Sequence, residues 1–299
     1  MRLALPLLLA AASASAQFAA NELDYIGRIG LTGADYTGTG GLQKVTSSFP
    51  NVITSSGFTS YGLIAGTSAQ YNGGGTQIGN GTWAADTLTA TTRQVGLFTG
   101  MEFINNNGGR TSAHESFVAS SLVTAGQAPR YLAGTSNRYN GGSAELGQVA
   151  WIYDWQTDTT TRLGLTSAET YSSTGYYRSN FSSSTPAAVV GGTTYLLGRN
   201  STSVTVGGTN YMSEAVWLHN LGTGTTTRLG FTTGEFAQTG NNFGPNSLEF
   251  GIESGRVLGQ SGLVSSGKSF SGTDSWVHDI ATGTTMLIGL RGGIYEAMP

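Results

Sequence analysis

The chain lacks cysteine and carries little charge. Its 299 residues include no Cys, 14 Lys or Arg and 17 Asp or Glu, for a formal net charge of −3. Without cysteine, disulfides and thiolate-bound zinc are excluded, so stability has to come from packing. A weakly acidic chain with no basic cluster has nothing to neutralise a row of phosphates, so we do not expect nucleic acid as a partner.

Long apolar runs and helical spacing are also missing beyond the first residues. Met1–Ala16 has one basic residue, an apolar stretch and an Ala-Ser-Ala ending, the pattern of a secretory signal peptide. No later run approaches the ~20 apolar residues that cross a bilayer, so we expect no membrane span. The sequence therefore predicts a secreted or cell-surface protein whose residues 17–299 form one domain.

Glycine is abundant, at 46 residues, and three landmarks recur in step with it. A glycine at a strand end is followed by a tryptophan and then by a glycine within a short apolar run, and successive tryptophans are 59 to 68 residues apart. The landmarks are Gly66, Gly134, Gly198 and Gly259, then Trp83, Trp151, Trp217 and Trp276, then Gly96, Gly164, Gly230 and Gly289. They define repeats over about 32–97, 98–165, 166–231 and 232–290. Because the tryptophan keeps one repeat position, we expect it to pack between repeats and not to bind a ligand.

Each repeat predicts four strands, A to D, through period-two or β-branched runs bounded by turn residues. In the third repeat these are Ala187–Val190, Thr194–Arg199, Glu214–His219 and Thr226–Phe231. The predicted fold is all-β and β-propeller-like, with four four-stranded blades and an extra N-terminal strand. The extra strand is a further D-type run at Tyr25–Leu31. It either pads the last blade, or leaves an open ring that self-associates through a surplus edge strand, or belongs to a larger repeat array.

The two long connections of each repeat should emerge on one face of such a blade, and we expect function there. In the third repeat they are the D–A connection Thr166–Thr185 and the B–C connection Asn200–Met212. The B–C loops contain aromatic and amide side chains that could stack on and hydrogen-bond a sugar ring, at Tyr71, Arg138, Tyr139, Asn140 and Tyr211. Asn-Gly is equally the commonest turn dipeptide, which is the structural alternative.

An acidic residue beside an aromatic one follows each D strand. The four that we nominate are Asp35, Glu102, Glu169 and Glu235. Carboxylates from several loops could hold calcium at the centre of a ring. Alternatively, each carboxylate accepts backbone N–H bonds and closes its own loop, which we favour because all repeats share the spacing.

Candidates for catalysis are few. The only residues peculiar to one repeat are Arg110, His114 and Glu115 in the second D–A connection. His219 and His278 share a strand position, which argues for packing or exposure, and a triad of His278 and Asp279 with a serine has no nucleophile elbow to support it. We therefore name no catalytic residue.

Several motifs together resemble a family of bacterial exported tandem-repeat proteins. They are IGLTGADY at Ile29–Tyr36, AGTSNRYNGGSAELGQVAWIYD at Ala133–Asp154 and RLGLTSAETY at Arg162–Tyr171. The family's units read roughly "IGLTGxEY" followed by "RYNGG" and "LGQxAWxY". There is a looser likeness to kelch-type propeller blades. The resemblance implies export and a repeat fold, and it implies no particular activity.

These features lead to one functional expectation and two alternatives. We expect a secreted, non-catalytic binding or adhesion protein that recognises glycan or another cell-surface partner through its long-loop face. One alternative is a secreted polysaccharide hydrolase or lyase with its site at a central channel. The other is a structural component of an extracellular matrix or coat. Apart from calcium, no cofactor is expected.

Overall fold

A computed structural model of the chain describes residues 30–31, 33–41, 45–46, 63–86, 89, 91–115, 130–166, 176–206, 209–236, 247–264 and 270–288. The predicted signal peptide and most of the N-terminal D-type run lie outside these residues. Within them, no helix is both long enough and apolar enough to cross a membrane.

The described strands form four antiparallel sheets, which confirms the all-β prediction; each has four strands in chain order, and the third has a fifth strand, β9, that pairs with β11. The first sheet contains β1 (Val45–Thr46), β2 (Leu63–Gln70), β3 (Gly79–Asp86) and β4 (Thr91–Val95). The second contains β5 (Ser112–His114), β6 (Tyr131–Asn137), β7 (Gln148–Asp154) and β8 (Thr159–Arg162). The third contains β9 (Tyr177–Phe181), β10 (Ala187–Val190), β11 (Thr193–Val206), β12 (Thr209–Asn220) and β13 (Thr225–Leu229). The fourth contains β14 (Ser247–Glu253), β15 (Arg256–Val264), β16 (Phe270–Asp279) and β17 (Thr284–Ile288).

The third sheet corrects two expectations about its loops. The predicted D–A connection contains a strand, because β9 pairs with the same strand β11 that β10 pairs with further along. The predicted B–C loop is instead a long hairpin, in which Ser201 to Val206 pair with Glu214 to Thr209. The Thr and Val residues of this stretch have high strand propensity, which suits the pairing.

Each repeat tryptophan lies directly opposite the landmark glycine of its neighbouring strand. The register pairs Gly66 with Trp83 and Gly134 with Trp151, and the last two repeats do the same. At Gly66, an added Cβ would fall on the indole ring, within 2.9 Å of both Cε2 and Cη2 of Trp83. The glycine is therefore required because the ring covers the place where a side chain would be.

The tryptophans fill the spaces between successive sheets. Trp151 packs with Ala84 and Val95 of the first sheet, and Trp217 packs with Ala150 and Leu163 of the second. Trp276 packs in the same way with Leu197, Val216 and Leu229 of the third. All four repeat tryptophans are buried, which supports the packing role and gives the chain one small apolar core per pair of sheets.

A polar contact repeats beside each of these cores. The backbone N–H of Leu97, just after strand β4, donates to Ser136 Oγ on β6 of the next sheet (3.0 Å). Phe231 donates likewise to Ser261 Oγ (3.0 Å) and Leu165 to Asn200 Oδ1 (3.3 Å). Leu31 donates to Ser68 Oγ (2.9 Å), so the end of the N-terminal D-type run lies on the first sheet as the end of a preceding sheet would.

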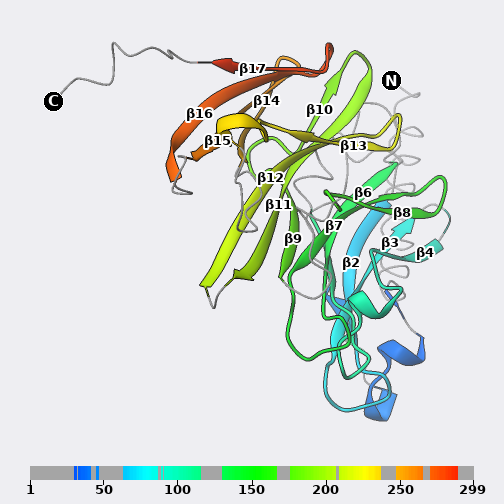
Figure 1. The fold of residues 1–299 in the computed structure, drawn as a ribbon. Coiled ribbons are helices and arrows are strands. Elements are labelled where there is room, and N and C mark those ends of the chain that lie inside the picture. The colour runs from blue at the N-terminus through cyan, green and yellow to red at the C-terminus, as the bar shows by residue number, and fades with distance from the viewer. Residues whose placement is uncertain are drawn as a thin grey trace, which may run out of the picture.

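Figure 1 shows the sheets following one another in chain order, from the cyan first sheet to the orange and red fourth sheet. Among the described strands, none of the fourth sheet pairs with one of the first. Short 3-10 helices follow three of the D-type runs. Helix η1 (Ala34–Tyr36) follows the N-terminal run, η3 (Met101–Phe103) follows β4, and η4 (Gly234–Phe236) follows β13. A further one, η2 (Thr39–Gly41), comes after η1. These helices contain three of the four nominated acidic residues, Asp35, Glu102 and Glu235.

Candidate functional site

The 3-10 helices hold the B–C loops of the first two sheets by backbone hydrogen bonds. The N–H groups of Tyr139 and Asn140 both donate to the carbonyl of Glu102, at 2.8 and 3.1 Å. In the first sheet, Tyr71 and Asn72 donate in the same way to the carbonyl of Asp35, at 2.8 and 2.9 Å. The structural alternative predicted that each carboxylate closes its own D–A loop. At Asp35 and Glu102 the acceptor is instead the main-chain carbonyl, and the N–H groups that it binds belong to the B–C loop.

Both loops turn through an Asn-Gly pair in left-handed backbone conformation. The φ angles are 50° at Asn72 and 79° at Gly73, and 51° at Asn140 and 79° at Gly141. Asparagine and glycine tolerate positive φ better than other residues, and two successive positive φ angles are characteristic of a type I′ turn. The turn interpretation of these dipeptides is confirmed.

The Glu102 carboxylate lies in an ionic cluster between the second and third sheets. Arg138 Nε donates to its Oε1 at 2.7 Å, and Arg162 Nη1 donates to its Oε2 at 3.1 Å. Both guanidinium groups also lie over the ring of Tyr177, at 5.3 and 5.6 Å from its centroid. These contacts join η3 to the second and third sheets. Arg138 is fully buried and therefore has no contact with solvent.

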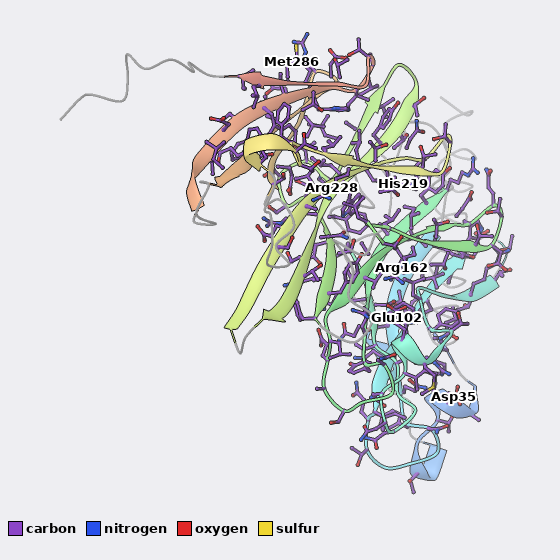
Figure 2. The ribbon with its side chains drawn as sticks, in the orientation of Figure 1. Asp35, Glu102, Arg162, His219, Arg228 and Met286 are labelled. Carbon is purple, nitrogen blue, oxygen red and sulfur yellow. The ribbon has the colours of Figure 1, made fainter. Side chains whose placement is uncertain are left out.

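The equivalent carboxylate in the first repeat is in a looser setting. Asp35 Oδ2 lies 3.9 Å from Arg110 Nη1, and the Asp35 side chain is 53% exposed. Figure 2 shows Asp35 far from Glu102 and Arg162, which lie close to each other. Among the described residues, no three His, Asp or Glu side chains gather as a metal site would require. Calcium binding therefore stays a prediction.

The second B–C loop carries a polar network around Tyr139, a residue that is partly exposed. Its half-buried hydroxyl lies 3.3 Å from both Thr111 Oγ1 and Asn137 Nδ2. The Asn137 amide also donates to Glu145 Oε2 (2.7 Å) and accepts from Gln148 Nε2 (3.1 Å). These bonds hold amide, carboxylate and hydroxyl groups in fixed positions beside an aromatic ring.

The other nominated residues are placed differently. Tyr71 is buried, whereas Asn140 is exposed. The side chains of Tyr211 and Glu235, and the whole of Glu169, lie outside the described residues. Sequence reasoning missed the other members of this network, Thr111, Asn137, Glu145 and Gln148. Thr111 precedes β5 and Gln148 lies on β7, and only the pairing of these strands with β6 brings them together.

The three residues considered for catalysis do not form a cluster. Arg110 and Glu115 lie beyond opposite ends of β5, and the side chain of His114 is outside the described residues. Burial raises the pKa of Glu115, and Arg178 on the adjacent β9 opposes that shift. A half-buried carboxyl near one arginine does not by itself indicate a reaction.

His219 and His278 are both buried on strand faces. Their Nδ1 atoms lie 2.9 Å from Thr226 Oγ1 and 2.8 Å from Thr285 Oγ1, respectively, across the C–D strand pair. Burial lowers the pKa of each imidazole, which favours the neutral form. The packing interpretation of this shared position is supported.

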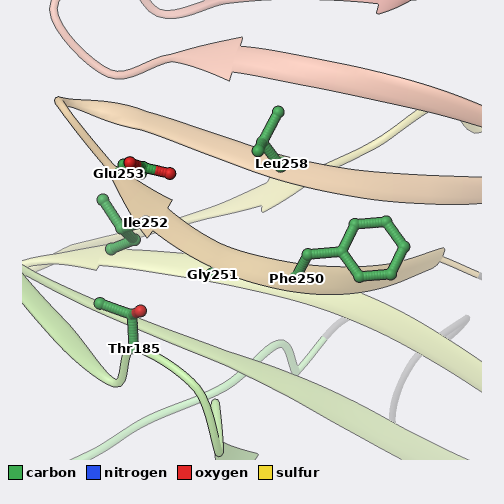
Figure 3. Close-up of a pocket in the computed structure, with 6 residues that line it drawn as sticks. All are labelled: Thr185, Phe250, Gly251, Ile252, Glu253 and Leu258. Carbon is green, nitrogen blue, oxygen red and sulfur yellow. The ribbon is translucent and has the colours of Figure 1, made fainter.

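A hollow lies apart from these residues, where the third and fourth sheets meet. It has a volume of about 210 Å³ and is lined by Thr185, Phe250, Gly251, Ile252, Glu253 and Leu258. The register of β14 shifts between Glu249 and Gly251, so Phe250 is bulged out of the ladder. Figure 3 shows Phe250 and Leu258 projecting on the same side of strands β14 and β15.

Together, the fold and the clamped loops define an all-β protein of successive four-stranded meander sheets. No protein-family model matches the chain, and no curated protein matches it. Among solved structures, TolB from Acinetobacter baumannii is similar over 75% of this chain and 40% of its own, at 14% identity and a TM-score of 0.25. The chain thus spans less than half of TolB.

Two further structures are comparable in likeness. One is a complex of BT0996 with RGII, with 9% identity, a TM-score of 0.26, and coverage of 75% of this chain and 69% of its own. The other is a glycoside hydrolase, with 10% identity, a TM-score of 0.26, and coverage of 87% of this chain and 75% of its own. Scores this low assign neither a fold family nor an activity.

Proposed function

We propose that the protein is an exported, β-propeller-like, non-catalytic binding protein that recognises glycan through the B–C loop of its second sheet. The observation that carries this proposal is the fixed polar network around the partly exposed Tyr139, whose hydrogen-bonding groups could meet sugar hydroxyls. Aromatic faces pack against the apolar faces of sugar rings, while amides and carboxylates bind hydroxyls.

The rest of the loop supports a binding role through its rigidity. The backbone bonds to Glu102 and the buried Arg138 fix the loop before any ligand arrives. A fixed site loses less conformational entropy on binding than a flexible one. In this proposal Arg138 and Glu102 position the loop, and Tyr139, Asn137 and Asn140 contact the ligand.

The propeller-like arrangement is supported by the series of sheets. The sheets follow one another along the chain, the tryptophans of the second, third and fourth each pack on the sheet before, and the end of the N-terminal run lies on the first sheet as the end of a preceding one would. Export is supported by the composition of Met1–Ala16.

A glycan array followed by calorimetry on the strongest ligand would test the proposal. We expect Tyr139→Ala to weaken binding about tenfold or more, since a tenfold loss corresponds to about 1.4 kcal/mol. Tyr139→Phe keeps the ring and should lose less. Val189→Ala, at an exposed residue of β10 on the third sheet, serves as the control. Absence of any bound glycan, or a ligand whose affinity ignores Tyr139→Ala, would refute the proposal.

A further inference from the structure

The fourth sheet exposes an apolar face that the other sheets bury. Leu258, Val277 and Met286 are direct neighbours across β15, β16 and β17, and Ile288 follows two residues after Met286. Leu258 is 36% exposed, Met286 55% and Ile288 44%. Figure 2 shows Met286 at the outer side of the molecule, on the last strand.

The repeats provide an internal comparison for this face. The third-sheet residues at the positions of Leu258 and Ile288 are Leu197 and Leu229, which are 0% and 1% exposed. Both pack in the cluster that contains Trp276 of the following sheet. Ala133 and Leu163 of the second sheet are buried in the same way with Trp217. In each case the face is covered by the next sheet of the same chain.

The exposed face is also electrically balanced. At one end Arg256 Nε lies 3.5 Å from Asp279 Oδ2, on neighbouring strands, so the two charges compensate each other. Toward the other end the polar contact is between Gln260 Nε2 and Ser275 Oγ, at 3.5 Å. Moreover, Met286 stands where the second and third sheets have the exposed threonines Thr161 and Thr227. The outer edge of the last sheet is therefore more apolar than its counterparts.

We propose that a second copy of this chain covers this face, with the fourth sheet of each copy packed on that of the other about a two-fold axis. The three faces equivalent to it are all covered by sheets, and facing sheets pack about 10 Å apart with interdigitated side chains. In a second copy, the equivalent faces of the first three sheets are already covered, which leaves its own fourth sheet as the complementary surface.

A two-fold pairing uses one patch twice, and this mostly apolar patch, whose charges are Arg256, Asp279 and Glu253 at one end, suits such a pairing. The hollow beside Phe250 and Leu258 gives such an interface an indentation that a side chain of the other copy can enter. Phe250, at 53% exposed, extends the apolar surface along β14. This proposal is independent of glycan binding, because Tyr139 lies on the second sheet.

Analytical ultracentrifugation over a range of concentrations tests the pairing. We expect the mature protein to show a concentration-dependent dimer, and Ile288→Lys to weaken the dimer at least tenfold by placing two ammonium groups in the apolar interface. Because Ile288 is already exposed, the variant should fold normally by circular dichroism. Met101→Lys changes a more exposed apolar residue on η3, and the dimer should not respond to it.

Single cysteines give a second readout, since the chain has none of its own. A short bis-maleimide should link Met286→Cys into covalent dimers much faster than it links Met101→Cys. Two results would overturn the proposal: a monomer at every concentration with equal, slow linking of both variants, or a dimer that Ile288→Lys leaves intact.

Discussion

Replacing Gly66 by alanine should destabilise the protein through one identifiable contact. The new Cβ would meet atoms of the Trp83 indole only, with Cε2 at 2.8 Å and Cη2 at 2.9 Å, and no backbone atom is among its nearest neighbours. Real Cβ atoms do not approach carbon this closely, so the ring or the strand must shift. Overpacking of this kind costs about 1–3 kcal/mol. We expect a loss of about 2 kcal/mol in the free energy of unfolding.

A double-mutant cycle separates this contact from other effects. Trp83→Phe removes the six-membered part of the indole that meets the new Cβ, at a cost of its own from lost packing. In that background Gly66→Ala should cost much less than 1 kcal/mol, which gives a coupling energy above about 1 kcal/mol. Urea denaturation followed by circular dichroism measures all four proteins, and an unchanged slope with denaturant would show that only stability has changed.

The third sheet provides the matched comparison. An added Cβ at Gly198 would meet both Trp217 and the backbone carbonyl of Asn180 on β9. Trp217→Phe should therefore fail to rescue Gly198→Ala, whereas Gly75→Ala, with its nearest neighbour 3.8 Å away, should be close to neutral. If Gly66→Ala were tolerated, or were equally harmful with and without Trp83, the glycine would not be required by the ring and our reasoning would be wrong.

Three further predictions concern the loops and the buried histidines. Glu102→Gln should cost about 2–3 kcal/mol in urea denaturation because it leaves the buried Arg138 charge without the Glu102 anion. Asp35→Asn, at an exposed and longer ion pair, should cost less than about 1 kcal/mol. Similar losses for the two variants would contradict a larger contribution to stability from the Glu102 cluster. Asn140→Ala should cost about 1 kcal/mol and Asn140→Gly almost nothing, because of the positive φ; equal costs would exclude that cause. The wild-type protein should lose stability below about pH 6.5, because the unfolded chain binds a proton at His219 that the buried imidazole, with its lowered pKa, resists. His219→Gln should reduce this loss. Above that pH His219 is neutral in both the folded and the unfolded chain, so the stability of the variant and of the wild type should respond alike to pH.

The sequence predicted the sheets well because its repeats mark the strand register. Ala187–Val190 matches β10, and the predicted strands Glu214–His219 and Thr226–Phe231 fall on β12 and β13. Alternation and turn residues are local signals, so they identify strands directly. The strand β9 was missed because its sequence resembles a polar loop. Only its pairing with Gly198 to Thr202 of β11 distinguishes it from one.

The site was less predictable because burial depends on neighbours that are distant in the sequence. Arg138 and Tyr139 are adjacent and looked equally suited to a ligand, yet Arg138 is enclosed by Glu102, 36 residues away, and by Tyr177 on the next sheet. Tyr71 occupies the position of Tyr139 in the first repeat and is buried. Equivalent positions in a repeat therefore have different surroundings, and the sequence pattern alone does not distinguish a ligand-contacting side chain from a structural one.

The polar contacts between sheets explain how diverged repeats keep a common arrangement. The residue two positions after each landmark glycine is Ser68, Ser136, Asn200 or Ser261, and each accepts the N–H that follows the preceding D-type run. An unpaired buried N–H costs about 1–3 kcal/mol, so losing any of these acceptors disfavours that sheet-to-sheet contact. The tryptophan makes the packing between sheets favourable, and the hydrogen bond fixes where along the strand it occurs. Since Leu31 makes this bond to the first sheet, the N-terminal run takes the place of a preceding sheet's last strand at that contact.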